Sequence, residues 1–334
     1  MKTSALKYIL PPELIASHPA VPRDSARLMV INRRKGRIAD DTFQNIDQYF
    51  IRGDVLVFNQ SRVFPARIMA RTAKGRQVEV LFLNEKPPHQ WEVLIGGRAK
   101  QGEKLEFTHG LTGVIRKGEE KILEINLSQR QLFTFLDKYG SVPLPPYIKR
   151  KATACDKKDY QNVFAQAIGS AASPTAGLHF TTELIDRLKE KGVEVEFVTL
   201  HVGLGTFAPI KTDKVEDHPI HTEHYEIDAA TIRNIQKAKR EGRRIIACGT
   251  TTLRVLESMN DASGTEKGET NIFIYPGYKF KLVGGLVTNF HTPESSLLAL
   301  VWAFGGRGLM RRAYQRAIKQ RYRFFSYGDG MLII

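Results

Sequence analysis

Residues 53–67, GDVLVFNQSRVFPAR, mark the point at which the chain changes character. The stretch Asp54–Asn59 contains four consecutive apolar residues, which predicts a buried strand. After Arg62 come short alternating runs, separated by turn pairs such as Lys74-Gly75, at a spacing of about ten residues. These runs are Val78–Leu83, Trp91–Ile95, Lys104–Phe107, Gly113–Ile115 and Ile122–Leu127. Short strands at this spacing predict a small antiparallel barrel or sandwich.

Helices alternate with strands on both sides of this β-rich segment. Thr181 is a good N-cap, Gly192 ends the same segment, and apolar residues recur on one face between them. The predicted order there is a helix over Thr181–Lys191, a strand over Val193–Leu200, a helix over Asp228–Glu241 and a strand over Arg244–Cys248. Such alternation with short connections predicts α/β units.

The predicted fold is an α/β main domain, with a mixed, largely parallel sheet and helices, interrupted by an inserted small antiparallel β-barrel domain. We place the α/β catalytic domain at residues 1–61 plus 146–334 and the barrel at 62–145. The inserted segment carries 14 basic and 9 acidic residues, a net charge of +5, and the rest of the chain carries 36 and 26, a net charge of +10. The positive charge is therefore spread over both parts.

The composition is that of a soluble globular chain with a positive surplus. Fifty Lys and Arg residues against 35 Asp and Glu residues give 50 − 35 = +15, and 42% of the residues are hydrophobic. The longest apolar run, Leu297–Phe304, is too short to span a bilayer, and two cysteines give no disulfide framework. We therefore expect a cytoplasmic protein with no membrane partner. The surplus predicts a polyanion as partner, and nucleic acid is the leading class.

Three loops place small and polar residues where strands meet helices, the position at which open α/β sheets bind ligands. They are Gly169–Phe180 (GSAASPTAGLHF), His201–Phe207 (HVGLGTF) and Gly249–Glu257 (GTTTLRVLE). The first precedes a helix, whose free N–H groups favour an anion. The second lacks the third glycine of a dinucleotide fingerprint, so its Rossmann signal is weak. For the first and third loops, a capped helix with no ligand is the alternative.

The run His218-Pro-Ile-His221-Thr-Glu223-His224 invites a metal interpretation. Pro219 interrupts a continuous helical face and the spacing matches no familiar zinc site, so no metal site is predicted. A proton-transfer or hydrogen-bonding role for one of the histidines or for Glu223 is favoured, because imidazole titrates near neutrality.

The C-terminal region is the clearest candidate for binding nucleic acid. Between Arg307 and Arg323 there are seven basic residues and no acidic one. On a helix, one stripe is basic and another is apolar. The basic stripe consists of Arg312, Arg316 and Lys319. Aromatic residues follow, and Tyr327 among them is a candidate for stacking on an unpaired base. A buried terminal strand is the stronger alternative for these aromatics, and a solvated face is the alternative for the stripe.

The loops lie within longer stretches that together resemble one known family. The stretches are LPPELIASHP, RDSARLMV, GDVLVFNQSRVFPAR, PLPPYIKR, SPTAGLHFT, VTLHVGLGTFAPI, HTEHYEI, GTTTLRVLES, IFIYPGYKFKLVGGLVTNFH and RFFSYGDGMLI. They begin at residue 10 and reach the C-terminus, so they cover nearly the whole chain. The sequence resembles the S-adenosylmethionine:tRNA ribosyltransferase-isomerase family of queuosine biosynthesis. That family's fold, an α/β domain with an inserted β-barrel, agrees with the prediction above.

The resemblance implies a reaction in which S-adenosylmethionine is a co-substrate and donates its ribosyl group. The acceptor is the aminomethyl group of 7-aminomethyl-7-deazaguanine at the wobble position of a tRNA. The ribosyl unit rearranges to an epoxycyclopentanediol, which gives epoxyqueuosine-tRNA, and adenine and methionine leave. The reaction implies no metal and no catalytic cofactor, and we expect a monomer.

The implied chemistry needs a base next to the sulfonium, a proton for the departing adenine and donors for developing oxyanions. On the matching motifs, we hypothesise that His179, His201 and either His221 or Glu223 transfer protons. Asp329 is expected to hydrogen-bond the modified base or its amine. The residues expected to bind S-adenosylmethionine are Ser173, Thr175, Gly177, Gly203, Gly205, Thr206 and Thr250, with Thr251 and Arg254 on the methionine carboxylate or the ribose hydroxyls.

Four positions depart from the family pattern. Gly284 stands where Asp is expected, Thr292 where Leu is expected, and Gly330 and Ser173 where Ala is expected. The lost Asp matters most, because it would be a candidate ligand contact.

Two functions of other classes stay open. An S-adenosylmethionine-dependent RNA methyltransferase would have a glycine-rich loop after its first strand, but Asn59-Gln60-Ser61 stands there. A non-catalytic RNA-binding factor needs only basicity and a β-barrel.

Overall fold

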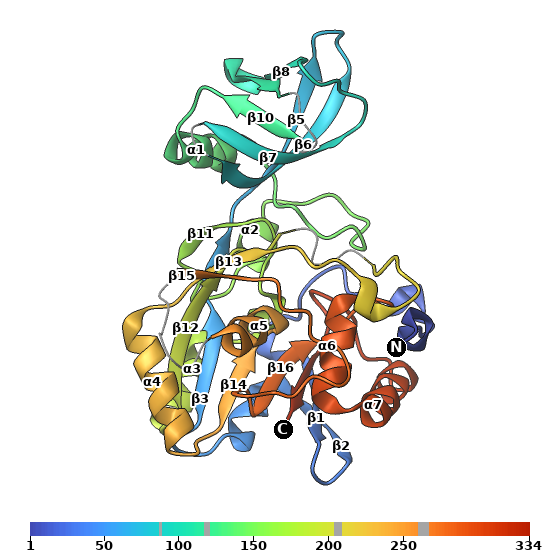
Figure 1. Cartoon of the computed structure of the whole chain (residues 1–334), viewed down its shortest axis with the longest axis vertical. Coiled ribbons are helices and arrows are strands. Elements are labelled where there is room, and N and C mark those ends of the chain that lie inside the picture. The colour runs from blue at the N-terminus through green and yellow to red at the C-terminus, as the bar shows by residue number, and fades with distance from the viewer. Residues whose placement is uncertain (87–88, 117–120, 204–208, 260–266) are drawn as a thin grey trace.

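The computed structural model describes residues 1–86, 89–116, 121–203, 209–259 and 267–334 (Figure 1). Within them, nine strands form one mixed sheet in the order β15-β13-β12-β3-β14-β16-β17-β1-β2. Their bounds are β1 Arg27–Asn32, β2 Arg37–Thr42, β3 Val55–Asn59, β12 Glu194–Leu200, β13 Glu223–Glu226, β14 Ile245–Cys248, β15 Lys267–Thr270, β16 Gly285–Asn289 and β17 Gly330–Ile333. The neighbouring strands β12, β3, β14 and β16 are parallel, whereas β13, β15 and β2 join antiparallel at the two edges.

Helices cover both faces of this sheet. The helices of this domain are α2 Asp156–Asp159, α3 Thr182–Glu190, α4 Ala229–Arg240, α5 Thr250–Ser258, α6 Ser296–Gly305 and α7 Arg307–Lys319. Short 3-10 turns are η1 Thr3–Leu6, η2 Pro12–Leu14, η3 Arg23–Ser25, η4 Phe43–Tyr49, η6 Thr175–His179 and η8 Val215–Asp217. The Thr181 side chain accepts a hydrogen bond from the backbone N–H of Leu184 at 3.1 Å, so Thr181 caps α3 as predicted.

Strand β3 shows why the sheet needs cover on both sides, since all five of its residues are buried. Leu56 and Phe58 pack with the residues of α3 and η4, whereas Val55 and Val57 pack with those of α4, α5, α6 and α7. This alternation follows from the two-residue period of a strand. The predicted α/β class with a mixed sheet is confirmed.

The segment after β3 forms a closed antiparallel barrel in the order β10-β7-β6-β5-β8-β9. Its elements are β5 Arg67–Thr72, β6 Gln77–Lys86, β7 Gln90–Gly96, β8 Lys104–Phe107, η5 Thr108–Gly110, β9 Thr112–Ile115, β10 Ile122–Ile125 and the helix α1 Gln129–Tyr139. Trp91 and Phe82 are buried in its interior, with Leu132 and Leu136 of α1 packed against the same core. The prediction of an inserted barrel is confirmed, and the barrel stands apart from the main sheet in Figure 1.

The junction between the two parts has a small sheet of its own. Strand β4 (Ser61–Val63) pairs in parallel with β11 (Ala167–Ser170), next to the place where the chain enters and leaves the barrel. All barrel strands and α1 lie inside residues 62–145, and the boundaries at 62 and 145 stay a prediction.

The end of the chain is buried in the sheet. Strand β17 lies between β16 and β1, antiparallel to the first and parallel to the second, and all four of its residues are buried. The aromatic residues Phe324, Phe325 and Tyr327 are buried ahead of this strand and are not part of it, and the prediction that an aromatic residue here contacts a base stays untested.

Gly140, directly after α1, gives a test of the junction. A Cβ atom there would lie 2.1 Å from the carbonyl oxygen of Pro65, and backbone cannot move away as a flexible side chain would. We expect Gly140→Ala to lower the free energy of unfolding by about 1–3 kcal/mol, as overpacking does. Gly308 of α7 has open space around its Cβ position, so Gly308→Ala is the control and should leave stability unchanged or slightly raised. Equal losses in denaturant unfolding would contradict the steric argument.

Candidate active site

One pocket lies at the carboxyl ends of β14 and β16, beside the turn η6. It encloses about 560 Å³ of empty space, counting the part open to solvent. Its walls are Tyr147, Ser173, Pro174, Thr175, Ala176, Val202, Gly249, Thr250, Thr251, Thr288, Asn289, Phe290, His291, Thr292, Leu297, Phe325 and Ser326. This is the place at which parallel sheets bind ligands, because the loops after neighbouring strands converge there.

Four of the predicted ligand contacts line this pocket: Ser173, Thr175, Thr250 and Thr251. The Ser173 hydroxyl is buried and has no hydrogen-bond partner within the described part of the chain. A buried hydroxyl in a pocket wall is suited to bind a polar group of a ligand, because leaving it unpaired is costly. The backbone N–H groups at the start of α5, at Thr250 and Thr251, add a preference for an anionic group.

Of the three predicted glycines, the two that the structure describes, Gly177 and Gly203, are not in the pocket wall. Gly177 lies inside η6, where a Cβ atom would come 2.8 Å from the amide oxygen of Asn162. Gly203 follows Val202, which does line the pocket, but is not itself a wall residue. Gly205 and the neighbouring Thr206 lie outside the described residues.

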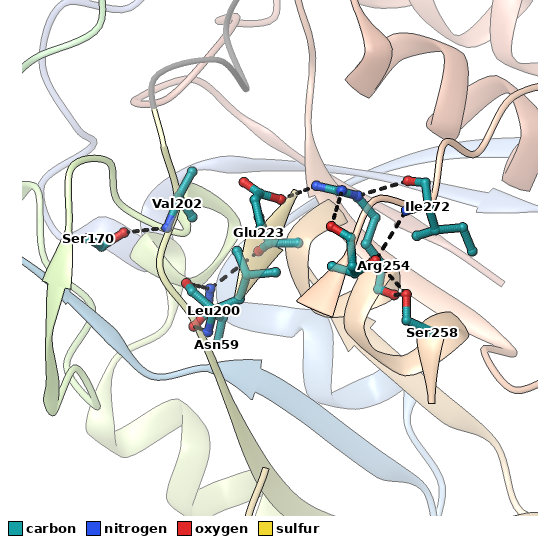
Figure 2. Close-up of polar contacts among 10 residues, drawn as sticks. Asn59, Ser170, Leu200, Val202, Glu223, Arg254, Ser258 and Ile272 are labelled. Atoms are coloured by element: carbon teal, nitrogen blue, oxygen red, sulfur yellow. Dashed lines mark hydrogen bonds and ion pairs between the residues drawn. The ribbon is translucent and has the colours of Figure 1, made fainter. Parts of the chain in front are cut away.

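Asn59 and Ser170 hold the loops around the pocket in position (Figure 2). The Asn59 side chain accepts from the backbone N–H of Leu200 at 3.1 Å and donates to its carbonyl oxygen at 2.9 Å. Ser170 accepts from the backbone N–H of Val202 at 2.9 Å. These contacts tie the residues after β12 to β3 and β11, so that Val202 is fixed at the pocket wall.

His179 lies one layer behind the pocket. Its ring stacks on Phe43 with 4.6 Å between the ring centres, and its Nε2 lies 3.2 Å from the Nδ2 of Asn289. Asn289 Oδ1 accepts a hydrogen bond from Thr175 at 3.0 Å, so its NH₂ group donates to His179. Burial lowers the pKa of His179 to about 3, and the charge of Arg323 makes a smaller contribution in the same direction. A neutral His179 therefore orients Asn289, which does line the pocket.

His201 and His221 are in different surroundings. The His201 ring packs over Gly169, where a Cβ atom would lie 2.9 Å from its Cε1, and burial lowers its pKa. Its Nδ1 is buried with no hydrogen-bond partner in the described residues. His221 is exposed just before β13 and does not line the pocket.

Glu223 and Arg254 form a buried ion pair beside the pocket (Figure 2). Arg254 also donates from Nε to the carbonyl oxygen of Ile272 at 3.2 Å and from Nη2 to that of Thr270 at 3.5 Å. Neither Arg254 nor Glu223 is a wall residue. The expected contact of Arg254 with the methionine carboxylate stays a prediction, and in this arrangement its guanidinium is engaged by Glu223 of β13, by Thr270 at the end of β15 and by Ile272.

Asp329 and Tyr327 are also structural in this arrangement. Asp329 is buried and accepts hydrogen bonds from the backbone N–H groups of Arg27 at 3.1 Å and Arg323 at 2.7 Å. Tyr327 is 2% exposed and donates to Asp156 at 2.9 Å. The prediction that Tyr327 stacks on a base stays untested, and in this arrangement its ring is buried and neither Tyr327 nor Asp329 lines the pocket.

Two members of the basic stripe on α7 hold the helix to the β1–β2 hairpin. Arg316 forms an ion pair with Asp40, and Arg312 donates to the carbonyl oxygen of Gly36 at 3.2 Å. Lys319 is exposed. The prediction that these side chains bind RNA stays untested, and their packing partners supply a structural reason for two of them.

Several wall residues were not among the predicted site residues: Tyr147, Thr288, Asn289, His291, Phe325 and Ser326. Asn289 and His291 could have been found from the sequence, because polar residues that follow a buried strand were the signal used for the three loops. Both stand at the end of the buried strand β16. The His291 Nε2 lies 2.8 Å from the Thr288 hydroxyl, and burial lowers the pKa of His291 to about 3. No local pattern marks Tyr147 and Phe325, because their place in the wall depends on how distant segments pack.

Of the four departures from the family pattern, two lie away from the pocket and two lie in its wall. Gly284 precedes β16, at the opposite end of this strand from Asn289, so an Asp there would not reach the pocket. At Gly330 a Cβ atom would lie 2.9 Å from the Phe43 ring. Ser173 and Thr292 are wall residues, and both place a hydroxyl-bearing side chain in the wall.

The chain is similar to known proteins over its whole length. The profile of a family described as "Queuosine biosynthesis protein" matches residues 3–333. The chain belongs to this family. It is 48% identical over 340 residues to a protein from Carboxydothermus hydrogenoformans and 45% identical over 336 residues to one from Aquifex aeolicus, with 100% of both chains covered in each case. Both relatives are named S-adenosylmethionine:tRNA ribosyltransferase-isomerase.

A solved structure of the family agrees with the fold. The crystal structure of S-adenosylmethionine tRNA ribosyltransferase from Thermotoga maritima matches with a TM-score of 0.58 and 38% identity. The match covers 99% of this chain and 100% of that chain. The family assignment that the motifs predicted is confirmed.

The described residues contain no group of three or more His, Cys, Asp or Glu side chains placed to hold a metal ion. Likewise, no helix within the described ranges has the length and apolar character needed to cross a bilayer.

The buried ion pair gives a prediction about stability. Replacing Glu223 by Leu leaves Arg254 buried without its carboxylate, which should lower the free energy of unfolding by about 3–5 kcal/mol. Adding Arg254→Met removes the unpaired charge, so the double variant should be more stable than the single one. The matched control is Glu226→Gln on the same strand, because its ion pair with Lys267 is exposed and should cost about 0–1 kcal/mol. Similar losses for the variants at Glu223 and Glu226 in urea unfolding would contradict the pairing argument.

The low pKa of His179 gives a prediction about pH. The unfolded chain binds a proton at this residue below a pH of about 6.5, whereas the folded protein does not until about pH 3. The contribution of neutral His179 to the free energy of unfolding is therefore fully present above about pH 6.5, and it is lost as the pH falls from there towards 3. His179→Gln keeps an acceptor for Asn289 but does not titrate, so stability should fall less steeply between pH 6 and 4, by up to about 1.4 kcal/mol per pH unit. A wild-type slope in His179→Gln would refute the assignment.

Proposed function

We propose that this protein is an S-adenosylmethionine:tRNA ribosyltransferase-isomerase. It transfers the ribosyl moiety of S-adenosylmethionine to 7-aminomethyl-7-deazaguanine at the tRNA wobble position and isomerises it, and it releases adenine and methionine. The observation that carries the proposal is the hydroxyl-lined pocket at the carboxyl ends of β14 and β16 in a chain that matches the family from residue 3 to residue 333. The full-length relatives are named for ribosyl transfer, and this favours it over methyl transfer or binding alone.

The pocket has the chemistry that S-adenosylmethionine requires. Apolar walls from Val202, Phe290 and Leu297 suit the adenine ring and the carbon atoms bonded to the sulfonium. Hydroxyls of Thr250 and Thr251 at the start of α5 suit the methionine carboxylate, which the helix N-terminus also favours. Hydroxyls of Ser173 and Thr175 on the opposite loop suit the ribose.

The proton-transfer roles follow from the surroundings of each imidazole. His201 stays our candidate base, because it adjoins the wall residue Val202 and its Nδ1 has no partner in the described residues. His179 acts as a positioning residue, through Asn289. The exposed His221 is the remaining candidate acid, since Glu223 is engaged by Arg254. The proposal also includes a cytoplasmic monomer as the working form.

Product analysis tests the function directly. The protein is incubated with S-adenosylmethionine and a tRNA that carries 7-aminomethyl-7-deazaguanine, and the small molecules are separated. Release of adenine and methionine in equal amounts is expected. S-adenosylhomocysteine would instead indicate methyl transfer, and tight tRNA binding with no turnover would indicate a binding factor. A tRNA with guanine at the wobble position is the negative control.

Neighbouring threonines on α5 provide a matched test of the pocket. Thr251 lines the pocket, whereas the Thr252 hydroxyl donates to the backbone carbonyl of Cys248 at 2.8 Å and points away from it. Thr251→Val should lower kcat/KM for S-adenosylmethionine by about 10-fold or more, as loss of a hydrogen bond to a charged group does. Thr252→Val should leave kcat/KM within about twofold of wild type. The reverse order in steady-state kinetics would move the carboxylate site elsewhere.

A further inference from the structure

The polyanionic substrate must reach the pocket across one of its edges, and one edge is basic. Tyr147 lines the pocket and is followed by Ile148, Lys149, Arg150 and Lys151. We call residues 147–151 the pocket-edge segment. No acidic residue occurs between Tyr147 and Asp156, and Asp156 is buried.

Burial alternates along the pocket-edge segment. Ile148 is buried and packs with Leu144, Leu178 and other apolar residues beneath the segment. Lys149 and Lys151 are exposed, and Arg150 is turned inward. Ile148 and Arg150 therefore face inward, and Lys149 and Lys151, which alternate with them, both face outward. Lys149 follows the wall residue Tyr147 by two residues, a span of at most about 7 Å along the chain.

A buried carboxylate keeps this segment in place. Arg150 donates to both oxygens of Asp156 at 2.7 Å and to the carbonyl oxygen of Ser17 at 3.0 Å. Asp156 also accepts from Tyr327 at 2.9 Å and from the backbone N–H of Thr153 at 2.7 Å. This paired network, with Arg150 as its cation, lowers the pKa of Asp156, although burial alone would raise it. Asp156 therefore stays charged and neutralises Arg150, which leaves the two outward lysines as the net positive charge.

Neither lysine forms an ion pair with another described residue. Among the described residues, no carboxylate oxygen lies within 4.0 Å of the Nζ of Lys149 or Lys151. The basic stripe on α7 differs, because Arg316 there is ion-paired with Asp40. Position separates the two surfaces as well, since α2 lies at the end of the sheet that faces the barrel, whereas α7 lies beside the β1–β2 hairpin (Figure 1).

Aromatic rings meet the segment inside the pocket. Tyr147 packs against Phe325 with 4.7 Å between the ring centres, and both line the wall. The Tyr147 hydroxyl lies 2.6 Å from that of Ser326, another wall residue. Phe325 has a φ of 71°, a left-handed conformation that costs energy in a residue with a side chain. A strained conformation at a pocket wall is consistent with a functional role for Phe325. Aromatic faces are the usual platforms for unpaired bases.

We propose that the pocket-edge segment is the RNA-binding edge of the pocket: Lys149 and Lys151 bind backbone phosphates that flank the reacting base, and Tyr147 with Phe325 contacts the base itself. This rests on the proposed function for its substrate and adds the surface that receives it. A lysine ammonium binds a phosphate as a point charge and releases a counterion when it does so, which makes the contact measurable through salt.

The test compares two charge-matched double variants. Lys149→Gln/Lys151→Gln and Arg233→Gln/Lys237→Gln both lower the net charge from +15 to +13, so the long-range field changes equally. Arg233 and Lys237 are exposed on α4 and belong to no predicted site. Binding of the anticodon stem–loop is measured at several salt concentrations, and S-adenosylmethionine binding is measured as a check on folding.

The Lys149/Lys151 variant should lose about 1.4 to 1.8 from the slope of log K against log salt, at about 0.7 to 0.9 per phosphate contact. The α4 variant should keep the wild-type slope, and both should bind S-adenosylmethionine as wild type does. Tyr147→Phe keeps the ring and should retain stem–loop binding, whereas Tyr147→Ala should weaken it by at least fivefold. An unchanged slope in the Lys149/Lys151 variant, or an equal loss in both double variants, would overturn the proposal. Adenine release by the wild type in the same preparation separates this result from a failure of the proposed function.

Discussion

The side chain of Asn59, at the end of β3, is the contact on which the pocket depends. Both its amide groups are used: the oxygen accepts from the backbone N–H groups of Ser61 and Leu200, and the nitrogen donates to the carbonyl oxygen of Leu200. Parallel strands leave free backbone groups where their pairing ends, and those groups must be satisfied if they are buried. Asn59 does this at the point where the chain leaves β3 for the barrel. The end of β12 is thereby fixed, and Val202 can form part of the wall.

The fold could be predicted from the sequence because its signals are local. The four apolar residues of β3, the Thr181 cap of α3 and the short alternating runs of the barrel each depend on residues close in the chain. The pocket could be predicted in part, through Thr175 and Thr251, for the related reason that polar residues after a buried strand converge with those of its neighbours. What could not be predicted is pairing between distant residues, as between Arg254 and Glu223 or Tyr327 and Asp156. A charged or aromatic residue in a motif has the same appearance in the sequence whether it contacts a ligand or another buried side chain.

The buried charges explain how a chain of net charge +15 is both stable and selective for a polyanion. Several arginines are paired with carboxylates that are almost fully buried: Arg150 with Asp156, Arg244 with Asp54, Arg254 with Glu223 and Arg323 with Asp329. A carboxylate buried alone would be protonated or would destabilise the fold, so each of these arginines is needed as the partner of a buried carboxylate. Their charge is cancelled locally and does not act on a distant phosphate. The attraction for RNA therefore resides in exposed residues without such partners, and their position relative to the pocket decides where RNA binds.

The same burial decides what each histidine of the site can do in the chemistry. A general base works best when its pKa lies near the working pH, and burial holds the pKa of His291 at about 3. A sulfonium bound beside it would lower this pKa further, because a positive neighbour disfavours protonation. His291 is therefore a neutral hydrogen-bonding group of the wall, held by the Thr288 hydroxyl, and it does not remove the proton next to the sulfonium. His201 differs in its geometry: burial lowers its pKa as well, with the charge of Glu226 opposing that shift, but its Nδ1 has no hydrogen-bond partner among the described residues. We infer that proton abstraction belongs to the edge of the pocket near His201, and that the deep wall at Asn289 and His291 contributes orientation by neutral hydrogen bonds.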